Sequence, residues 1–198
     1  MRNLALIGAA LVIFLWTAKA RTEEMIAYTP TGADFPPDTD LSAVVEQSAT
    51  ADNVSAFLYM IRFAEGTAGS RGYNTMFGYR YFDDFSDHPR QSFPFTDKRG
   101  NRNTTDAAGA YQFLSRTWDD LVRRFGYPDF SPQWQDEAAI QLIRDKGALD
   151  DVEQGRFDVA VSKVRGVWAS LPGAGYNQPE RKMAELRTAY ESAGGWYA

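Results

Sequence analysis

An acidic residue interrupts an apolar helical stripe in the sequence. Phe57, Leu58 and Ile61 follow the three-and-four spacing of a helix with one buried face. One turn further, that face reaches Glu65, and Gly66 then ends the helix. A carboxyl group at this place is shielded from water and lies at the negative end of the helix dipole, and both effects favour its protonated form. Glu65 is therefore a candidate proton donor for cleavage of a glycosidic bond.

The helix pattern alone also allows a structural explanation, in which Glu65 pairs with Arg62 or Arg71. A hydrolytic glycosidase needs a second carboxylate, either as a nucleophile or to activate water. Four aspartates are candidates for that role: Asp83, Asp84, Asp87 and Asp106. Each of them is also of a type that forms turns and caps helices. Catalytic and structural roles for the carboxylates both stay open at this point.

Composition narrows the chemistry further. The chain has 198 residues, a net charge of −5, one histidine and no cysteine. These counts exclude disulfides, a cysteine nucleophile and a zinc site with several histidines, and we expect no metal and no cofactor. The acidic balance argues against a nucleic-acid partner, which normally requires a basic face. The single histidine, His88, precedes a proline and has no visible partner for a catalytic triad, so a structural loop role is favoured.

The first twenty residues, "MRNLALIGAALVIFLWTAKA", form a hydrophobic segment between positive charges. The apolar run of residues 4–18 is shorter than the roughly 20 residues that span a bilayer, and residues 18–20 have the small-x-small form of a signal-peptidase site. Residues 1–20 are predicted to be either a signal peptide or an anchor in the bacterial inner membrane. The protein would then be exported to the periplasm or tethered with its domain on the periplasmic side, and association with a virion is a third option.

The rest of the chain reads as a linker followed by one mainly helical domain. Residues 21–50 have the composition of a linker, with a short helix around 41–47, and residues 51–198 form the domain. Apolar periodicity predicts helices over 109–126, with Tyr111 and Phe125 on the buried face, over 131–147, around 157–168 and around 183–195. Residues 72–105 lack helical periodicity and predict loops with a small hairpin. The fold class is α+β, mainly α, with a small β or loop lobe.

Several strings in this domain resemble the phage lambda endolysin family. In order along the chain they are "FAEGT", "SDHPR", "AGAYQFLSRTWD", "DFSPQWQDEAAIQLI", "KGAL" and "VWASLPGAGYNQ". The resemblance covers roughly residues 55–195 and implies a lysozyme-like fold. It also implies a lytic transglycosylase that cleaves the glycan strand of peptidoglycan between N-acetylmuramic acid and N-acetylglucosamine, leaving a 1,6-anhydro-muramic acid end.

The resemblance assigns roles to particular residues. Glu65 matches the catalytic acid of the family in the same "EGT" context. Residues 109–112 resemble a Gly-x-x-Gln element that lines the sugar site, at the predicted start of a helix, and residues 175–177 resemble an Ala-Tyr-Asn element beside the acid. The candidates for contact with the sugar are therefore Tyr111, Gln112, Tyr176 and Asn177, with Ser170 in addition.

The implied mechanism needs only one carboxyl group, because the nucleophile is the C6 hydroxyl of the substrate itself. Two other functions stay open: a hydrolytic muramidase of the same fold, and a catalytically inactive wall-binding protein. A monomer is expected. The chain also departs from the lambda protein, with a shorter segment at 68–71 and a longer one at 91–107 on the expected rim of the groove.

Overall fold

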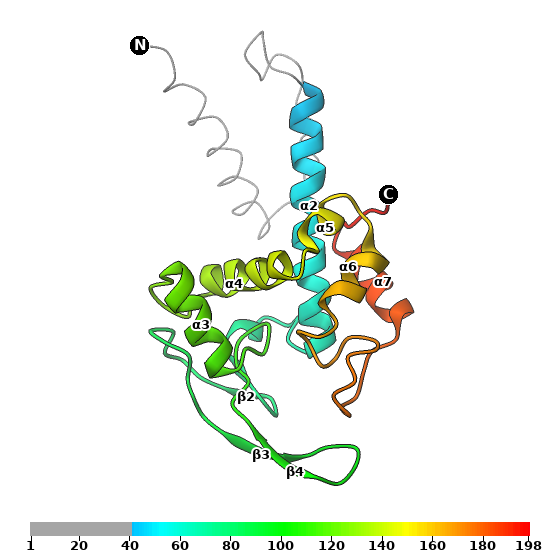
Figure 1. Cartoon of the computed structure of the whole chain (residues 1–198). Coiled ribbons are helices and arrows are strands. Elements are labelled where there is room, and N and C mark those ends of the chain that lie inside the picture. Colours follow the sequence, from blue (N-terminus) through cyan, green and yellow to red (C-terminus); the bar gives the residue numbers. More distant parts are fainter. Residues whose placement is uncertain (1–40) are drawn as a thin grey trace, which may run out of the picture. The chain divides into compact units, whose positions relative to one another are not determined.

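The computed structural model describes residues 41–198, so the hydrophobic segment and most of the expected linker lie outside the described residues (Figure 1). The elements follow one another as α2 Leu41–Glu65, the 3-10 turn η2 Gly72–Asn74, β1 Thr75–Met76, β2 Arg80–Tyr81, β3 Phe93–Thr96, β4 Arg102–Thr105, α3 Ser115–Phe125, α4 Pro132–Asp145, α5 Leu149–Glu153, α6 Phe157–Val164 and α7 Met183–Ser192. This is the α+β, mainly α, architecture with a small β lobe that the sequence predicted.

Helix α2 is longer than the sequence suggested. The short helix expected at 41–47 and the helix of the acidic residue are one element, Leu41–Glu65, because no glycine or proline stands between them. The helix ends where predicted, with Gly66 at a φ of 76°. Phe57 and Ile61 are completely buried, so the predicted apolar face does face the core.

The irregular lobe contains two small antiparallel sheets, where the sequence predicted loops with one small hairpin. Strand β1 pairs with β2, with Thr75 opposite Tyr81, and β3 pairs with β4, with Phe93 opposite Thr105. The β3–β4 hairpin falls within residues 91–107, the segment expected on the rim of the groove. Figure 1 shows this hairpin extending away from the helices.

The prediction that Tyr111 and Gln112 open a helix is wrong. Helix α3 begins only at Ser115, and residues 109–112 form a tight turn closed by paired hydrogen bonds between Ala108 and Phe113. The backbone φ angles of Gly109 and Gln112 are 79° and 48°. These angles belong to the left-handed region, which a right-handed helix excludes. At the other end of α3, Phe125 is 42% exposed rather than buried.

The remaining helices agree with the sequence in their starts better than in their ends. Ser131 is the N-cap of α4 and Pro132 its first residue, as predicted. Helix α6 ends at Val164, so Trp168 lies beyond it rather than within it. The five-residue helix α5 was not predicted, because so short a segment carries little periodicity.

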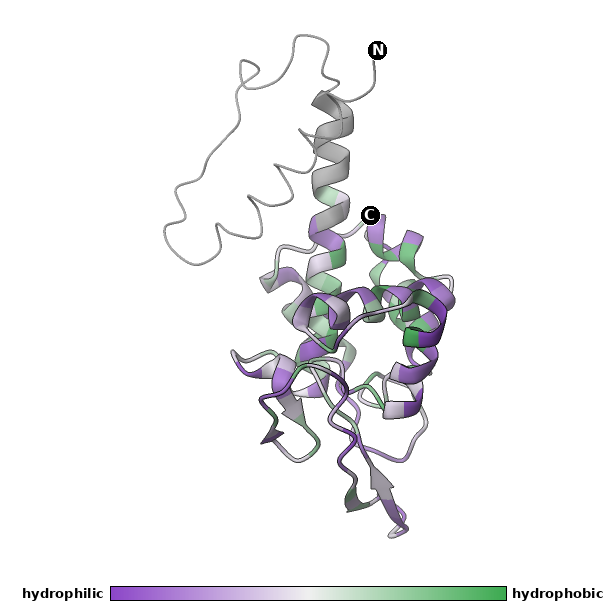
Figure 2. Cartoon of the chain, turned by 90° about the vertical axis from the view of Figure 1, so that its left-hand side faces the viewer, coloured by the Kyte–Doolittle hydropathy of each residue, from purple (hydrophilic) through white to green (hydrophobic). Residues whose placement is uncertain are grey.

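Two groups of aromatic side chains form much of the core. In the first, Phe157 of α6 packs against Phe57 of α2 and Tyr190 of α7, with ring centroids 6.0 and 4.7 Å apart. In the second, Phe130 packs against Trp118 of α3 at 4.7 Å and against His88 at 5.1 Å. Figure 2 shows hydrophobic and hydrophilic residues mixed along these helices, as expected where one face of each is buried.

His88 has the structural role that its context suggested. The imidazole is 2% exposed, its Nε2 donates to the Phe113 carbonyl at 2.9 Å, and its Nδ1 accepts from the Arg90 amide at 3.1 Å. Burial lowers the pKa of His88, so the neutral ring is favoured.

Among residues 41–198, the helices are all too short or too polar to cross a membrane.

Candidate active site

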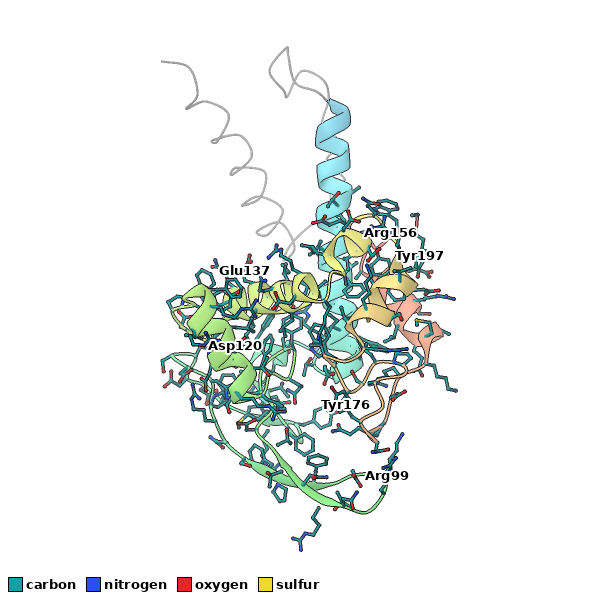
Figure 3. The ribbon with its side chains drawn as sticks, viewed as in Figure 1. Arg99, Asp120, Glu137, Arg156, Tyr176 and Tyr197 are labelled. Atoms are coloured by element: carbon teal, nitrogen blue, oxygen red, sulfur yellow. The ribbon has the colours of Figure 1, made fainter. Side chains whose placement is uncertain are left out.

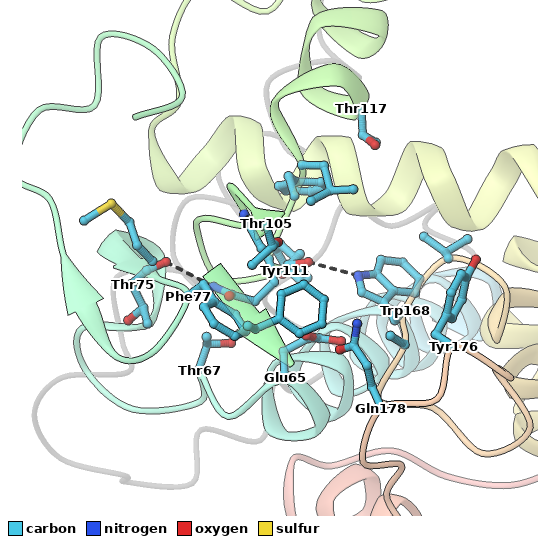
Figure 4. Close-up of a pocket in the computed structure, with 18 of the residues that line it drawn as sticks. Glu65, Thr67, Thr75, Phe77, Thr105, Tyr111, Thr117, Trp168, Tyr176 and Gln178 are labelled. Carbon is cyan, nitrogen blue, oxygen red and sulfur yellow. Dashed lines mark hydrogen bonds between the residues drawn. The ribbon is translucent and has the colours of Figure 1, made fainter. Parts of the chain in front are cut away.

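A cleft of about 920 Å³ opens beside the C-terminal end of α2 (Figure 4). Its walls come from six parts of the chain: the end of α2 with Glu65 and Thr67, β1 with the β1–β2 turn, the β3–β4 hairpin, residues 107–117, the end of α4, and the loop 166–178. Segments far apart in the sequence therefore meet around the acidic residue that the sequence singled out.

Glu65 is partly buried at the edge of the cleft. Burial raises the pKa of its carboxyl group from 4.5 to about 7, while hydrogen bonds from Ser170 and the charge of Arg181 lower it by less. The Ser170 hydroxyl donates to Oε1 of Glu65 at 2.6 Å. Near neutral pH a substantial fraction of Glu65 is therefore protonated, which a proton donor requires.

Neither Arg62 nor Arg71 pairs with Glu65, as the structural explanation would require. Arg71 pairs instead with Asp83, at 3.6 Å. The guanidinium of Arg62 lies over the rings of Tyr59 and Tyr73, at 5.7 and 5.2 Å from their centroids.

Glu65 is the one carboxylate among the described residues that line the cleft. The other candidate acids form turns and caps: Asp84 accepts from the Ser86 amide, Asp87 from the His88 amide, and Asp106 from the Ser115 amide. No second carboxylate from the described part of the chain thus stands in the cleft.

The turn of residues 109–112 is fixed by Gln135, a side chain that the sequence did not single out. Its Oε1 accepts from the Ala110 amide at 2.8 Å, and its Nε2 donates to the carbonyls of Tyr73 and Phe130 at 2.9 and 2.7 Å. A Cβ at Gly109 would stand 2.3 Å from this Oε1, so the close approach requires glycine. The Gly-x-x-Gln string marked the turn but not the residue that holds it.

Hydrogen bonds from the cleft side complete this turn. Thr67 Oγ1 donates to the Ala110 carbonyl at 2.5 Å, and Trp168 Nε1 donates to the Tyr111 carbonyl at 3.1 Å (Figure 4). Gln112 lines the cleft, and its Nε2 donates to the carbonyls of Thr75 and Gly109 at 3.1 and 3.0 Å. The side-chain oxygen of Gln112 has no hydrogen bond from the described residues.

Tyr111 lines the cleft with a side chain that is otherwise buried. It is 1% exposed, and its hydroxyl donates to Asp136 Oδ1 at 2.5 Å, while the Tyr73 hydroxyl donates to the same carboxylate at 2.9 Å. Burial raises the pKa of Asp136, and the two tyrosine hydrogen bonds and the charge of Arg62 oppose that rise. The hydrogen of the Tyr111 hydroxyl is thus used in the bond to Asp136.

Residues 176–178 form the opposite lip. Tyr176 is 49% exposed, lines the cleft, and donates its hydroxyl to the Gly166 carbonyl at 2.8 Å. Asn177 is not among the lining residues, and its carbonyl accepts from the amide of Lys98 in the β3–β4 turn at 3.0 Å. Figure 3 shows Tyr176 and Arg99 on the loop and on the hairpin that this bond connects. Gln178 lines the cleft and directly follows the motif that the sequence marked.

The family model for endolysins matches residues 55–197. The chain belongs to the endolysin family. It is 43% identical to the endolysin of Escherichia phage P2 over 160 residues, which are 74% of this chain and 95% of the relative. It is 40% identical to the endolysin of Escherichia phage lambda over 146 residues, which are 71% of this chain and 90% of the relative.

The fold of this endolysin is similar to solved structures of the lambda protein. One is bacteriophage lambda lysozyme complexed with a chitohexasaccharide, with a TM-score of 0.69 and 38% identity over 74% of this chain and 97% of that one. Another is lysozyme from bacteriophage lambda, with a TM-score of 0.63 and 37% identity over the same shares. The protein is thus a phage endolysin of the lambda lysozyme type, a muralytic enzyme.

The site residues predicted for this endolysin are placed in three ways. Glu65, Tyr111, Gln112 and Tyr176 all line the cleft. Ser170 contacts Glu65 rather than the cleft surface. Asn177 touches the hairpin through its backbone.

Proposed function

We propose that this endolysin is a lytic transglycosylase, and that Glu65 is its single acid–base group. The substrate is the peptidoglycan strand, and the cleaved bond joins N-acetylmuramic acid to N-acetylglucosamine. The proposal is carried by one observation: Glu65 is the one carboxylate among the described residues that line the cleft. The lambda lysozyme structure with a chitohexasaccharide supports a glycan as the ligand of this groove.

In the first step, protonated Glu65 donates its proton to the bridging glycosidic oxygen as the bond from that oxygen to C1 of the muramic acid breaks. A pKa of about 7 keeps the acid form available near neutral pH. The leaving N-acetylglucosamine carries the donated proton on its new hydroxyl group.

In the second step, the C6 hydroxyl of the same muramic acid attacks C1, and the Glu65 carboxylate accepts the proton of that hydroxyl. The enzyme returns to its starting state, no water is consumed, and the product ends in a 1,6-anhydro ring. Because the attack is intramolecular, the enzyme does not have to bind a separate nucleophile from solution. The hydrogen bond from Ser170 stabilises the carboxylate that exists between the two steps.

Hydrolysis would instead place a water on C1, and glycosidases that hydrolyse use a second carboxylate for this purpose. Asp106, which lies in the chain between the lining residues Thr105 and Ala107, accepts a hydrogen bond from the Ser115 amide. The geometry therefore favours attack by the substrate's own hydroxyl.

Product analysis tests this mechanism. Purified peptidoglycan is digested with the protein in water enriched in heavy oxygen, and the fragments are examined by mass spectrometry. Transglycosylation gives muramic acid ends that are lighter than reducing ends by one water and contain no solvent oxygen. Reducing ends labelled with heavy oxygen would overturn the proposal in favour of a hydrolytic muramidase. Absence of any cleavage would favour an inactive wall-binding protein.

We also propose that residues 1–20 direct export, so that the domain reaches the wall from the periplasmic side. The support is the apolar run between positive charges in the sequence. Fusion of residues 1–25 to alkaline phosphatase is expected to give periplasmic phosphatase activity, and a fusion that stays inactive would contradict this proposal.

A further inference from the structure

Tyr79 occupies a backbone position that suits glycine. It ends the three-residue turn between β1 and β2, and its φ is 58°, next to Gly78 at 75°. Three-residue hairpin turns commonly end in a left-handed residue, for which glycine is the usual choice. A bulky aromatic residue in this region is strained, and such strain is concentrated at functional sites.

The fold gains little from the Tyr79 side chain. It is 71% exposed, the largest exposed fraction among the large hydrophobic side chains that the structure describes. Its hydroxyl has no hydrogen-bond partner in the described part of the chain. Tyr81, two residues on, is 47% exposed, and the guanidinium of Arg71 lies 3.8 Å from its ring centroid. Packing within the protein therefore explains Tyr81 better than it explains Tyr79.

The ring of Tyr79 stands at the rim of the cleft, beside the catalytic acid. Tyr79 lines the cleft, as does Phe77 from the same turn. A Cβ placed on Gly66, the residue after Glu65, would lie 3.0 Å from the Tyr79 hydroxyl oxygen and 3.6 Å from the ring atom Cε1. Gly66 thus leaves the space in which the Tyr79 side chain passes next to the end of α2.

We propose that Tyr79 is a sugar-binding residue, whose ring stacks on the C–H face of an N-acetylhexosamine bound next to Glu65. This inference rests on the proposed function, because it requires a glycan in the cleft. One face of a pyranose ring exposes several C–H groups, which are apolar and slightly positive, and an aromatic face offers both apolar surface and negative charge. Phe77 and Phe95, with centroids 5.6 Å apart, extend the apolar lining from Tyr79 along the same side.

Binding without turnover tests the proposal. Every protein carries Glu65→Gln, so no bond is cleaved, and calorimetry measures the dissociation constant for a six-residue chito-oligosaccharide. Tyr79→Asn removes the ring while asparagine tolerates the left-handed backbone, and we expect it to weaken binding about tenfold. Tyr79→Phe keeps the ring and restores most of the affinity. The matched control, Tyr81→Ala, removes an exposed aromatic from the same hairpin outside the cleft lining and leaves affinity unchanged.

The outcomes are decisive in both directions. Weaker binding by Tyr79→Asn alone, with a midpoint of thermal unfolding that is equal or higher, supports stacking. An affinity for Tyr79→Asn within twofold of the parent overturns it, as does an equal loss in Tyr81→Ala, which would indicate a general effect of the hairpin. If Tyr79→Asn does not fold, Tyr79→Gly takes its place under the same criteria.

Kinetics on peptidoglycan provides a second readout with Glu65 intact. Loss of stacking is expected to raise KM for Tyr79→Asn more than it lowers kcat. The binding experiment does not depend on which product is formed. Hydrolytic products from the parent would therefore refute transglycosylation while leaving the assignment of Tyr79 to be decided by affinity.

Discussion

The inner wall of the cleft and its rim differ in how their residues are held and in how exposed their side chains are. The inner wall, the turn of residues 109–112 with Glu65 beside it, has its polar atoms held by buried side chains, above all Gln135. The rim consists of the β1–β2 turn, the β3–β4 hairpin and the loop around Tyr176. It presents exposed aromatic rings, and two of its residues, Tyr79 and Asn177, have left-handed backbones that suit glycine or asparagine.

This difference separates two tasks. Proton transfer needs a carboxyl group in a fixed place with a controlled pKa, and Glu65 is partly buried and accepts a hydrogen bond from the Ser170 hydroxyl. Sugar binding needs exposed surfaces, which a core cannot supply. Left-handed backbones occur in both regions, but in the inner wall the side chain of Gln112 donates hydrogen bonds to the carbonyls of Thr75 and Gly109, whereas the Tyr79 side chain on the rim is exposed.

The largest expected effect concerns the inner wall. Glu65→Gln keeps the size of the side chain but cannot donate or accept the proton that the reaction moves. We expect lytic activity to fall about 10²- to 10⁴-fold, measured as release of soluble fragments from purified peptidoglycan. Glu137→Gln on the exposed side of α4 is the matched control and keeps full activity. Equal activity in both variants would remove Glu65 from the mechanism.

The second expected effect concerns the residue that holds the inner wall. Gln135→Leu has a similar volume but leaves the Ala110 amide without its acceptor and the Tyr73 and Phe130 carbonyls without their donor. We expect the free energy of unfolding to fall by roughly 2–4 kcal/mol, measured by urea denaturation. Gln133→Leu, on the exposed face of the same helix, is the control and changes it by less than about 0.5 kcal/mol. A small effect at Gln135 would mean that the turn holds itself.

The third effect concerns pH. Only protonated Glu65 can act as the acid, so kcat/KM is expected to be constant below a pH of about 7 and to fall tenfold per pH unit above it. Ser170→Ala removes a hydrogen bond that lowers this pKa, so the alkaline limb moves to higher pH. Ser162→Ala, on the exposed side of α6, leaves the profile in place. A limb that moves to lower pH in Ser170→Ala would contradict the role given to this bond.

The sequence predicted the elements that have strong local signals. The apolar stripe of α2 and its end at Gly66, the proline at the start of α4 and the hairpin in the irregular lobe all follow from neighbours in the chain. The turn at 109–112 does not. Its left-handed angles at Gly109 and Gln112 are stabilised by Gln135, which is more than twenty residues away in the sequence. From periodicity alone, α3 was therefore predicted to begin at residue 109, before this turn, rather than at Ser115.

For the site, the sequence singled out Glu65 as a candidate acid but did not predict its surroundings. The position of an acidic residue on an apolar helical face can be recognised from a few neighbouring residues. The family motifs then identified the segments that form the two sides of the cleft. The hydrogen bonds from Ser170 to Glu65 and from Tyr111 to Asp136 join residues far apart in the sequence, so they depend on tertiary packing. Tyr79 has no signal in the sequence, because its strain is a property of the backbone that only the structure reveals.

The smallest expected effect concerns the rim, and its sign is the opposite of that at Gln135. Tyr79→Asn relieves the strain of a bulky residue at a φ of 58° and loses little packing, because the side chain is 71% exposed. We expect the free energy of unfolding to rise by about 1 kcal/mol, measured by urea denaturation at a pH below 7. The same exchange at Tyr81, whose ring lies against Arg71 in a regular strand, is expected to lower it slightly. If Tyr79→Asn lowered stability as much as an inner-wall variant does, the side chain would be part of the fold, and rim and wall would no longer differ in kind. A gain in stability combined with weaker glycan binding would instead show that the protein holds a strained residue at this position for the sake of its ligand.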